Sequence, residues 1–207
     1  MVEGDPMTAK AIPVIGVVGG IGSGKSRVAS LLEEAGCVVS DADALARAAL
    51  QDSMVRDTIV SWWGDGILEE DGSVSRAAVA DRVFADPAEL ERLEQLLHPL
   101  VEAARKAEFD AAADSTTALV IDAPLLLEVG LDRECDAVVF VDCPRELRLE
   151  RVASSRGWDA EELARREDRQ MPLDEKRSRA HHVLVNHGRV EDLREQVEAL
   201  LATLGRR

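Results

Sequence analysis

Gly19-Gly-Ile-Gly-Ser-Gly-Lys-Ser26 is the strongest pattern in this sequence of 207 residues. It matches G-x-x-x-x-G-K-[ST], a glycine-rich turn that joins a buried strand to a helix and binds phosphate groups. Ile12–Val18 before it is a short β-branched run, typical of a buried parallel strand, and Ser26–Ala35 after it has the pattern of a helix that ends at Gly36. A glycine turn without a ligand rarely has both neighbours, so the sequence predicts a nucleotide site here.

The chemistry of phosphate binding explains the spacing within this phosphate loop, residues 19–26. Glycines let several backbone N–H groups approach the phosphates, and the helix that follows adds its positive end. We expect Lys25 to reach the β- and γ-phosphates of ATP and the hydroxyl of Ser26 to bind Mg²⁺. The residues predicted to bind ATP here are Gly20, Ile21, Gly22, Ser23, Gly24, Lys25, Ser26 and Arg27.

Strand patterns and helix patterns alternate along the rest of the chain. Further strands are expected at Cys37–Ser40, Ala118–Ile121, Ala137–Val141 and His182–Val185. This alternation predicts an α/β fold, in which a parallel β-sheet is sandwiched by helices. Between 52 and 114 the pattern is helical, and we expect Pro99 to separate one helix that ends near Leu97 from another that reaches about Ala113.

The stretch from about Asp52 to Asp114 therefore looks like a helical insertion into this fold. Residues 1–11 are polar and are expected to form a disordered leader, within which translation could start at Met1 or at Met7.

Composition restricts the class of protein and of partner. The formal net charge of −15 argues against nucleic acid, which requires a basic surface. The sequence has no apolar run of the roughly 18 residues that would span a membrane. Cys37, Cys135 and Cys143 show neither metal-binding nor disulfide spacing, so we expect reduced thiols and a cytoplasmic protein, a monomer or weak homo-oligomer.

Three of the aspartates that follow predicted strands are candidates for the site. Asp41 and Asp43 come after the second strand, where an extended chain would point both side chains the same way, beside the phosphate loop. Such a carboxylate can accept a proton from a substrate hydroxyl, but Asp is also a good helix N-cap, and spacing alone favours neither role. Asp122 ends the third strand, where an aspartate can help to bind Mg²⁺ through water or can simply be a turn residue.

Arginines are concentrated near the C-terminal third of the chain. Guanidinium groups bind phosphate in bidentate fashion, so a mobile arm that carries them could close over ATP. We expect Arg151 and Arg156 to contact the nucleotide. The alternative is a solvated helix face on which each arginine pairs with a nearby glutamate. Seven arginines belong to this cluster: Arg145, Arg148, Arg151, Arg156, Arg165, Arg166 and Arg169.

Six short segments, taken in order, resemble those of the dephospho-coenzyme A kinase family, from Ile15 to about Leu200. The phosphate loop alone is shared by many families, whereas the ordered set is specific. The segments are Gly19–Ser26, Ser40-Asp-Ala-Asp-Ala-Leu-Ala-Arg47, Leu97-His-Pro-Leu100, Ala123-Pro-Leu-Leu-Leu-Glu128, the pair Arg166 and Gln170, and Val185-Asn-His-Gly188.

The resemblance implies that ATP phosphorylates the ribose 3′-hydroxyl of dephospho-coenzyme A, with Mg²⁺, in the last step of coenzyme A synthesis. It implies that Asp43 is the base, beside Lys25, and that Asn186 lies near the adenine. It also implies three regions: a nucleotide-binding core (12–51, 115–151 and 181–207), a helical substrate-binding insertion (52–114) and a helical lid (152–180). Departures are Val18 and Arg27, where the family commonly has threonine, and His181, where it often has aspartate. The implied substrate contacts are Asp43, Arg47, His98, Pro124, Leu125, Glu128, Arg166 and Gln170.

Two other functions fit parts of the sequence. A shikimate-type kinase also has carboxylates after its second strand, although the stretch 52–114 is larger than a compact acid substrate requires. A nucleotide-dependent switch would need no aspartate pair, and the sequence has no [NT]-K-x-D stretch for reading guanine.

Overall fold

The computed structural model describes residues 12–205, which form two compact units. The first unit contains 12–39 and 112–205, and the second contains Ser40–Ala111. The second unit therefore begins before α2, a helix that packs against α5 within the same unit. Among the described residues, no helix is both long enough and apolar enough to cross a membrane.

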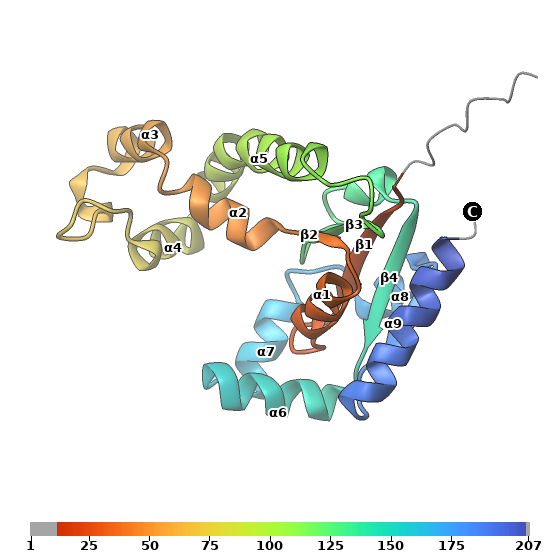
Figure 1. The fold of residues 1–207 in the computed structure, drawn as a ribbon. Coiled ribbons are helices and arrows are strands. Elements are labelled where there is room, and N and C mark those ends of the chain that lie inside the picture. The colour runs from red at the N-terminus through yellow and green to blue at the C-terminus, as the bar shows by residue number, and fades with distance from the viewer. Residues whose placement is uncertain (1–11, 206–207) are drawn as a thin grey trace, which may run out of the picture. The chain divides into compact units, whose positions relative to one another are not determined.

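A sheet of five strands forms the centre of the first unit, in the order β2-β3-β1-β4-β5 (Figure 1). Its neighbours β1 and β3, β1 and β4, and β4 and β5 run parallel, as the alternation of strands and helices predicts. The phosphate loop thus follows the central strand. The strands are β1 Val14–Gly19, β2 Val38–Asp41, β3 Leu119–Asp122, β4 Ala137–Asp142 and β5 His182–Val185.

Helices cover both faces of this sheet (Figure 1). Ile15 and Val17 of β1 point to one face and pack in a core cluster with residues of α1 (Lys25–Glu34) and α9 (Val190–Leu204). Successive side chains of a strand alternate between faces, so Gly16 and Val18 point to the other face. There α8 (Leu173–Arg179) contacts β1 and β4.

Three helices lie between β4 and β5: α6 (Arg145–Arg156), α7 (Ala160–Glu167) and α8. A short 3₁₀ helix, Leu131–Glu134, comes before β4. The sequence analysis expected a helical lid at 152–180, but it did not identify α8. Only one of its seven residues, Leu173, is apolar, so hydrophobic periodicity could not reveal it.

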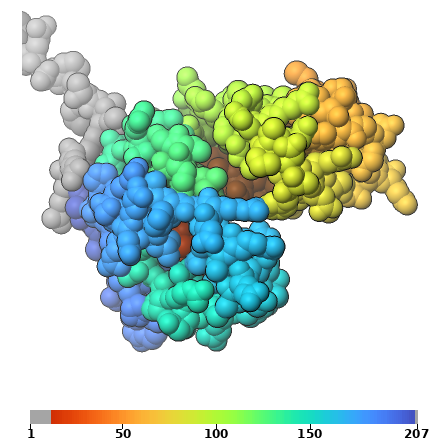
Figure 2. Space-filling view, turned by 180° about the vertical axis from the view of Figure 1, so that it is seen from behind, coloured from red at the N-terminus to blue at the C-terminus, as the bar shows by residue number. Residues whose placement is uncertain are grey.

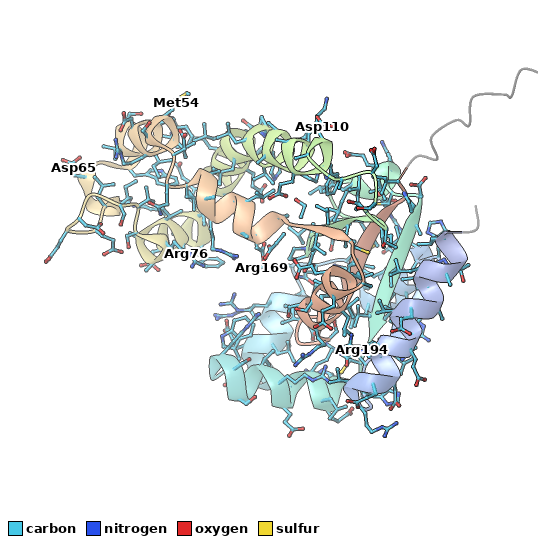
Figure 3. All side chains as sticks on the ribbon, in the orientation of Figure 1. Met54, Asp65, Arg76, Asp110, Arg169 and Arg194 are labelled. Atoms are coloured by element: carbon cyan, nitrogen blue, oxygen red, sulfur yellow. The ribbon has the colours of Figure 1, made fainter. Side chains whose placement is uncertain are left out.

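The second unit is helical, as its sequence predicts. A cluster that includes Val55, Ile59, Leu93 and Leu97 forms its core. The indole N–H of Trp63 donates to Glu89 at 2.8 Å. The elements are α2 Ala42–Ala49, α3 Ser53–Trp63 (which carries Met54 in Figure 3), the 3₁₀ turn Asp65–Ile67, α4 Arg76–Ala85 and α5 Pro87–Asp110.

The predicted break at Pro99 is wrong, because α5 is one helix of 24 residues that continues through Pro99. Proline in a helix removes one hydrogen bond and clashes with the preceding turn. Here Leu93 and Leu97 are buried just before it, and α2 and α4 both pack against α5. Tertiary packing therefore outweighs the local preference for a break.

Candidate active site

The phosphate loop leaves β1 at Gly19 and leads directly into α1, whose N-cap is Gly24. Gly24 has φ 92°, a left-handed conformation that favours glycine. A Cβ atom at this position would also collide with the side-chain amide of Asn186. The close approach of Asn186 and the turn into α1 therefore both require glycine here.

Lys25 is the first residue of α1, and its side chain turns back over the loop. The ammonium group donates to the carbonyl oxygen of Gly19 at 3.2 Å and is partly buried. Ser26 and Arg27 follow in the first turn of α1, and both are exposed. The loop backbone, the helix N-terminus and the lysine ammonium together form a positive environment suited to a polyphosphate.

Aspartates end the two strands on either side of β1. Asp122, the last residue of β3, is aligned with Val17 of β1 and is half-buried. Asp142, the last residue of β4, is aligned with Val185 of β5 and forms an ion pair with Arg177 at 2.9 Å. The structure thus brings Asp122 to the strand edge from which the phosphate loop starts.

Three side chains from distant parts of the first unit hold the carbonyl groups of the phosphate loop. Arg148 donates to the carbonyl of Ile21 at 3.3 Å and forms an ion pair with Glu167. Arg151 donates to the carbonyls of Gly22 and Ser23 at 3.3 and 3.1 Å. The amide of Asn186 also donates to the carbonyl of Ser23, at 2.7 Å. We call Arg148, Arg151 and Asn186 the loop clamp.

The loop clamp differs from the sequence analysis in what its members contact. Arg151 bonds to loop carbonyls and to the carbonyl of Asn186, at 3.1 Å, and its predicted contact with ATP stays a prediction. Arg148 was noted only as one of a cluster, although it is among the buried charged residues of the unit. The spacing of Arg145, Arg148 and Arg151 on one helix was the available signal, but the sequence could not show which of them is buried.

Trp158 contacts two arginines in the predicted lid. The guanidinium of Arg166 is 4.1 Å from the centre of a Trp158 ring, and that of Arg156 is 4.8 Å away. Arg166 also donates to Glu162 at 2.6 Å, and this hydrogen bond, followed by that from Arg165, lowers the pKa of Glu162. Arg156 and Arg166 therefore contact protein groups in this structure, and their predicted ligand contacts stay predictions.

Glu128 pairs with a lysine that the sequence analysis missed. The side chain of Lys176 is fully buried, and its ammonium lies 2.8 Å from the Glu128 carboxylate and donates to the carbonyl of Pro124 at 3.0 Å. Glu128 also accepts the backbone N–H of Met171 at 2.8 Å. Burial alone would raise the pKa of Glu128, but the hydrogen bonds from Lys176 and Met171 outweigh it and lower the pKa.

These contacts make Glu128 a link between the turn after β3 and the segment before α8. Its predicted contact with substrate stays a prediction, as do those of Pro124 and of Leu125, which is exposed. Gln170, directly before Met171, is half-buried. Sequence alone offered little warning about Lys176, because a lysine in a strongly charged helix is usually exposed.

Asp41 and Asp43 belong to the second unit, and they do not share an extended strand. The sequence analysis expected their side chains to point the same way, which is wrong because α2 begins between them, at Ala42. Asp41 is the N-cap and accepts the N–H of Ala44 at 2.8 Å. Asp43 lies exposed in the first turn of α2, and Arg47 is 3.7 Å from Asp41. The capping role suggested for Asp41 is confirmed.

Two histidines were singled out from the sequence. His98 is exposed on α5, where its predicted substrate contact stays a prediction. His181 exchanges two hydrogen bonds with Val138 of β4: its Nδ1 accepts the Val138 N–H at 2.9 Å, and its own N–H donates to the Val138 carbonyl at 2.8 Å. His181 thus helps to attach β5 to β4.

A cavity of about 140 Å³ lies beside the phosphate loop, at the end of β4. Figure 2 views the molecule from behind and shows red atoms from the N-terminal part of the chain in a hollow between blue segments. The walls of the 140 Å³ cavity carry both positive and negative groups. The lining residues include Gly20, Asp142, Arg148, Asp174 and Arg177.

A sequence profile and curated relatives of this chain all name the same family. The sequence profile described as "Dephospho-CoA kinase" matches residues 13–192. The dephospho-CoA kinase of Syntrophotalea carbinolica is 42% identical over 193 residues, which cover 92% of each chain. That of Deinococcus radiodurans is 44% identical over 191 residues, covering 92% of this chain and 91% of the relative.

Solved structures agree with this result. A crystal structure from Thermus thermophilus has a TM-score of 0.83 and 37% identity, and the match covers 94% of this chain and 99% of that one. A shikimate kinase from Aquifex aeolicus has a TM-score of 0.51 at 18% identity, covering 93% and 97%. The second likeness shows a shared fold alone.

Proposed function

This chain belongs to the dephospho-CoA kinase family, and we propose that it transfers the γ-phosphoryl group of ATP to the ribose 3′-hydroxyl of dephospho-coenzyme A. The products are coenzyme A and ADP, so the reaction completes coenzyme A biosynthesis. The observation that carries the proposal is the family match along most of the chain, which includes an intact phosphate loop. The enzyme is thus a phosphotransferase with an alcohol acceptor.

We assign the binding of the ATP phosphates to Gly20–Arg27. The loop N–H groups and the N-terminus of α1 would bind the β- and γ-phosphates, and Lys25 would offset the charge that develops during transfer. The contact between Lys25 and Gly19 supports this role, because it already holds the ammonium over the loop. Most of the acceleration would come from positioning and electrostatics rather than from covalent catalysis.

The residues present suit a magnesium ion. Mg²⁺ prefers oxygen ligands and usually keeps several waters while binding one or two protein groups and substrate phosphates. The exposed hydroxyl of Ser26 and, through water, the carboxylate of Asp122 are ligands of that kind. When bound there, the ion would neutralise charge on the β- and γ-phosphate oxygens.

We assign the role of base to Asp43. Its carboxylate would orient the acceptor hydroxyl and accept its proton as the bond to phosphorus forms. Exposure of Asp43 in the first turn of α2 supports the assignment, because the carboxylate is accessible to a ligand. Asp41 instead is occupied by capping α2. Substrate contacts are assigned to Asp43, Arg47, His98, Pro124, Leu125, Glu128, Arg166 and Gln170.

The remaining assignments complete the proposal. Residues 12–51, 115–151 and 181–207 would form the nucleotide-binding core, 52–114 the substrate-binding insertion and 152–180 the lid. Asn186 would lie near the adenine, and Arg151 and Arg156 near the nucleotide. We further propose a cytoplasmic enzyme that is a monomer or a weak homo-oligomer and binds no nucleic acid, in keeping with the net charge of −15.

The direct test is to incubate the purified protein with ATP, Mg²⁺ and dephospho-coenzyme A. Mass spectrometry should show one added phosphoryl group, and the product should coelute with authentic coenzyme A. Shikimate in place of dephospho-coenzyme A provides the matched control acceptor and should yield no product. Phosphorylation of shikimate alone, or ADP release that never depends on an acceptor, would contradict the proposal.

A further inference from the structure

We propose that Arg151 and Asn186 are positioning residues that act through the phosphate loop. Together with Arg148, they hold the loop carbonyls outward, so that the loop N–H groups face the nucleotide phosphates before ATP arrives. This inference deepens the proposed function, on which it depends for the identity of the ligand. It assigns Arg151 a task different from the direct contact with ATP that the sequence analysis expected.

The argument starts from the backbone itself. A loop that aims successive N–H groups at an anion must turn its carbonyl groups elsewhere, and buried carbonyls need hydrogen-bond donors. The carbonyls of Ile21, Gly22 and Ser23 all receive such donors from the loop clamp. Three consecutive carbonyls are therefore held by side chains from outside the loop.

The donors are well suited to this task. Asn186 is buried, and its backbone N–H donates to the carbonyl of Asp142 at 2.8 Å, which attaches the residue to the end of β4. Arg151 bridges the loop and the carbonyl of Asn186, so the two side chains support each other. A guanidinium has several donors in a rigid plane, which lets one residue hold several carbonyls.

Burial of charge also favours a fixed clamp over a mobile phosphate ligand. Arg148 is 4% exposed and is anchored by Glu167 and by the carbonyl of Cys143, at 3.3 Å. Separating a buried arginine from its anionic partner is unfavourable, so Arg148 is held in place. Arg151 lies one helical turn further along α6, where it contacts the next two loop carbonyls.

The experiment measures the loop without any nucleotide. Hydrogen exchange of the backbone amides in 20–26 is followed by mass spectrometry in the wild type, Arg151→Ala and Asn186→Asp. Aspartate has the size of asparagine but no N–H to donate, so it removes the hydrogen bond to Ser23 with little change in shape. Because its negative charge also repels phosphate, the exchange of the free loop is the deciding readout for this variant. Dissociation constants for ATP and ADP are then measured by calorimetry on the same proteins.

Both variants should exchange these amides faster than the wild type and should bind ATP and ADP more weakly by about tenfold or more, because each loses at least one hydrogen bond between a charged or buried group and the loop. The double variant should lose less than the product of the single losses, because both side chains hold the carbonyl of Ser23. Arg151→Lys, which keeps one donor group, should recover part of the affinity.

Arg194→Ala is the matched control. Arg194 is an exposed arginine of the same unit, labelled in Figure 3, and pairs with Glu34 at 2.7 Å. The Arg194→Ala variant should exchange the loop amides and bind ATP and ADP as the wild type does. If Arg151→Ala fails to fold, Asn186→Asp and Arg151→Lys test the same contact.

Unchanged exchange in the free loop would overturn the proposal, because a residue that only contacts phosphate cannot alter the loop before ATP binds. Faster exchange with unchanged nucleotide affinity would also overturn it. Neither readout needs phosphoryl transfer, so a failure of the proposed function would be seen separately, in the acceptor assay.

Discussion

The side-chain amide of Asn186 donates a hydrogen bond to the carbonyl oxygen of Ser23 at 2.7 Å, although 163 positions separate the two residues in the chain. The bond joins the segment after the last strand to the loop after the first strand. It also brings the amide of Asn186 against Gly24, where a larger residue has no room.

Gly24→Ala should therefore weaken ATP binding by tenfold or more. The added methyl group would meet the amide of Asn186, and the left-handed backbone would be strained by roughly 1–3 kcal/mol. Calorimetric titration with ATP measures the loss. Gly66→Ala is the control, because a methyl group there meets open space and no left-handed backbone. Equal affinity of the two variants for ATP would show that the tight fit around Gly24 is unimportant.

Asp43→Asn should lower turnover by about 10²-fold or more while leaving ATP affinity nearly intact, since the amide cannot accept the proton. Steady-state kinetics with dephospho-coenzyme A measure the change in turnover, and a separate ATP titration measures the change in ATP affinity. Asp41→Asn makes the same chemical change two positions earlier, and asparagine caps helices as well as aspartate does. It should keep nearly full turnover. A fully active Asp43→Asn enzyme would remove Asp43 from the role of base.

Lys176→Met should destabilise the protein by about 3 kcal/mol or more, because it leaves the Glu128 carboxylate without the buried cation that pairs with it. Urea unfolding followed by circular dichroism gives the change in free energy of unfolding. Arg179→Ala removes another cation of α8, whose ion pair with Glu175 is exposed, and should change stability by less than about 1 kcal/mol. Similar losses in the two variants would argue against a special role for Lys176.

Stability should fall in acid partly because of Glu128. Its folded-state pKa is lowered below the ordinary value of 4.5, so the folded state binds a proton at this site less readily than the unfolded state. The stabilisation is complete above the unfolded pKa and is lost as the pH falls through the folded pKa. Free energies of unfolding measured from pH 7 downward should decline less steeply in Glu128→Gln. Parallel pH profiles would contradict this assignment.

Thiol reagents should distinguish the three cysteines. Burial raises the pKa of Cys37 to about 11, and burial also raises the pKa of Cys143, so both are held as unreactive thiols near neutral pH. Cys135 is only partly buried. Brief alkylation of the native protein at pH 7.5, followed by peptide mass spectrometry, should label Cys135 first. Cys135→Ser should slow total labelling, and rapid labelling of Cys37 would contradict the expectation.

Much of the fold could be predicted from local patterns. The five strands are short β-branched runs, and the fold class follows from their alternation with helices. The errors have different causes. Packing of neighbours keeps α5 continuous through Pro99, and a capped helix start separates Asp41 from Asp43. The helix α8 was missed because its anchoring residue, Lys176, is a charged one.

The candidate site was predictable to different degrees. The phosphate loop is continuous in sequence and has its own spacing rule, so its residues could be identified directly. Arg148 and Arg151 could be located only as members of a cluster, because their partners are backbone carbonyls far away in the chain. No spacing rule reports a contact between a side chain and a distant backbone.

The attachment of Ser23 to Asn186 also has a consequence for biosynthesis. The ribosome translates the phosphate loop first, and the amide that bonds to it follows 163 positions after Ser23. A nascent chain therefore carries a phosphate loop that lacks this hydrogen bond until Asn186 has been translated. Competence for nucleotide should arise late, once β5 and Asn186 have emerged from the exit tunnel.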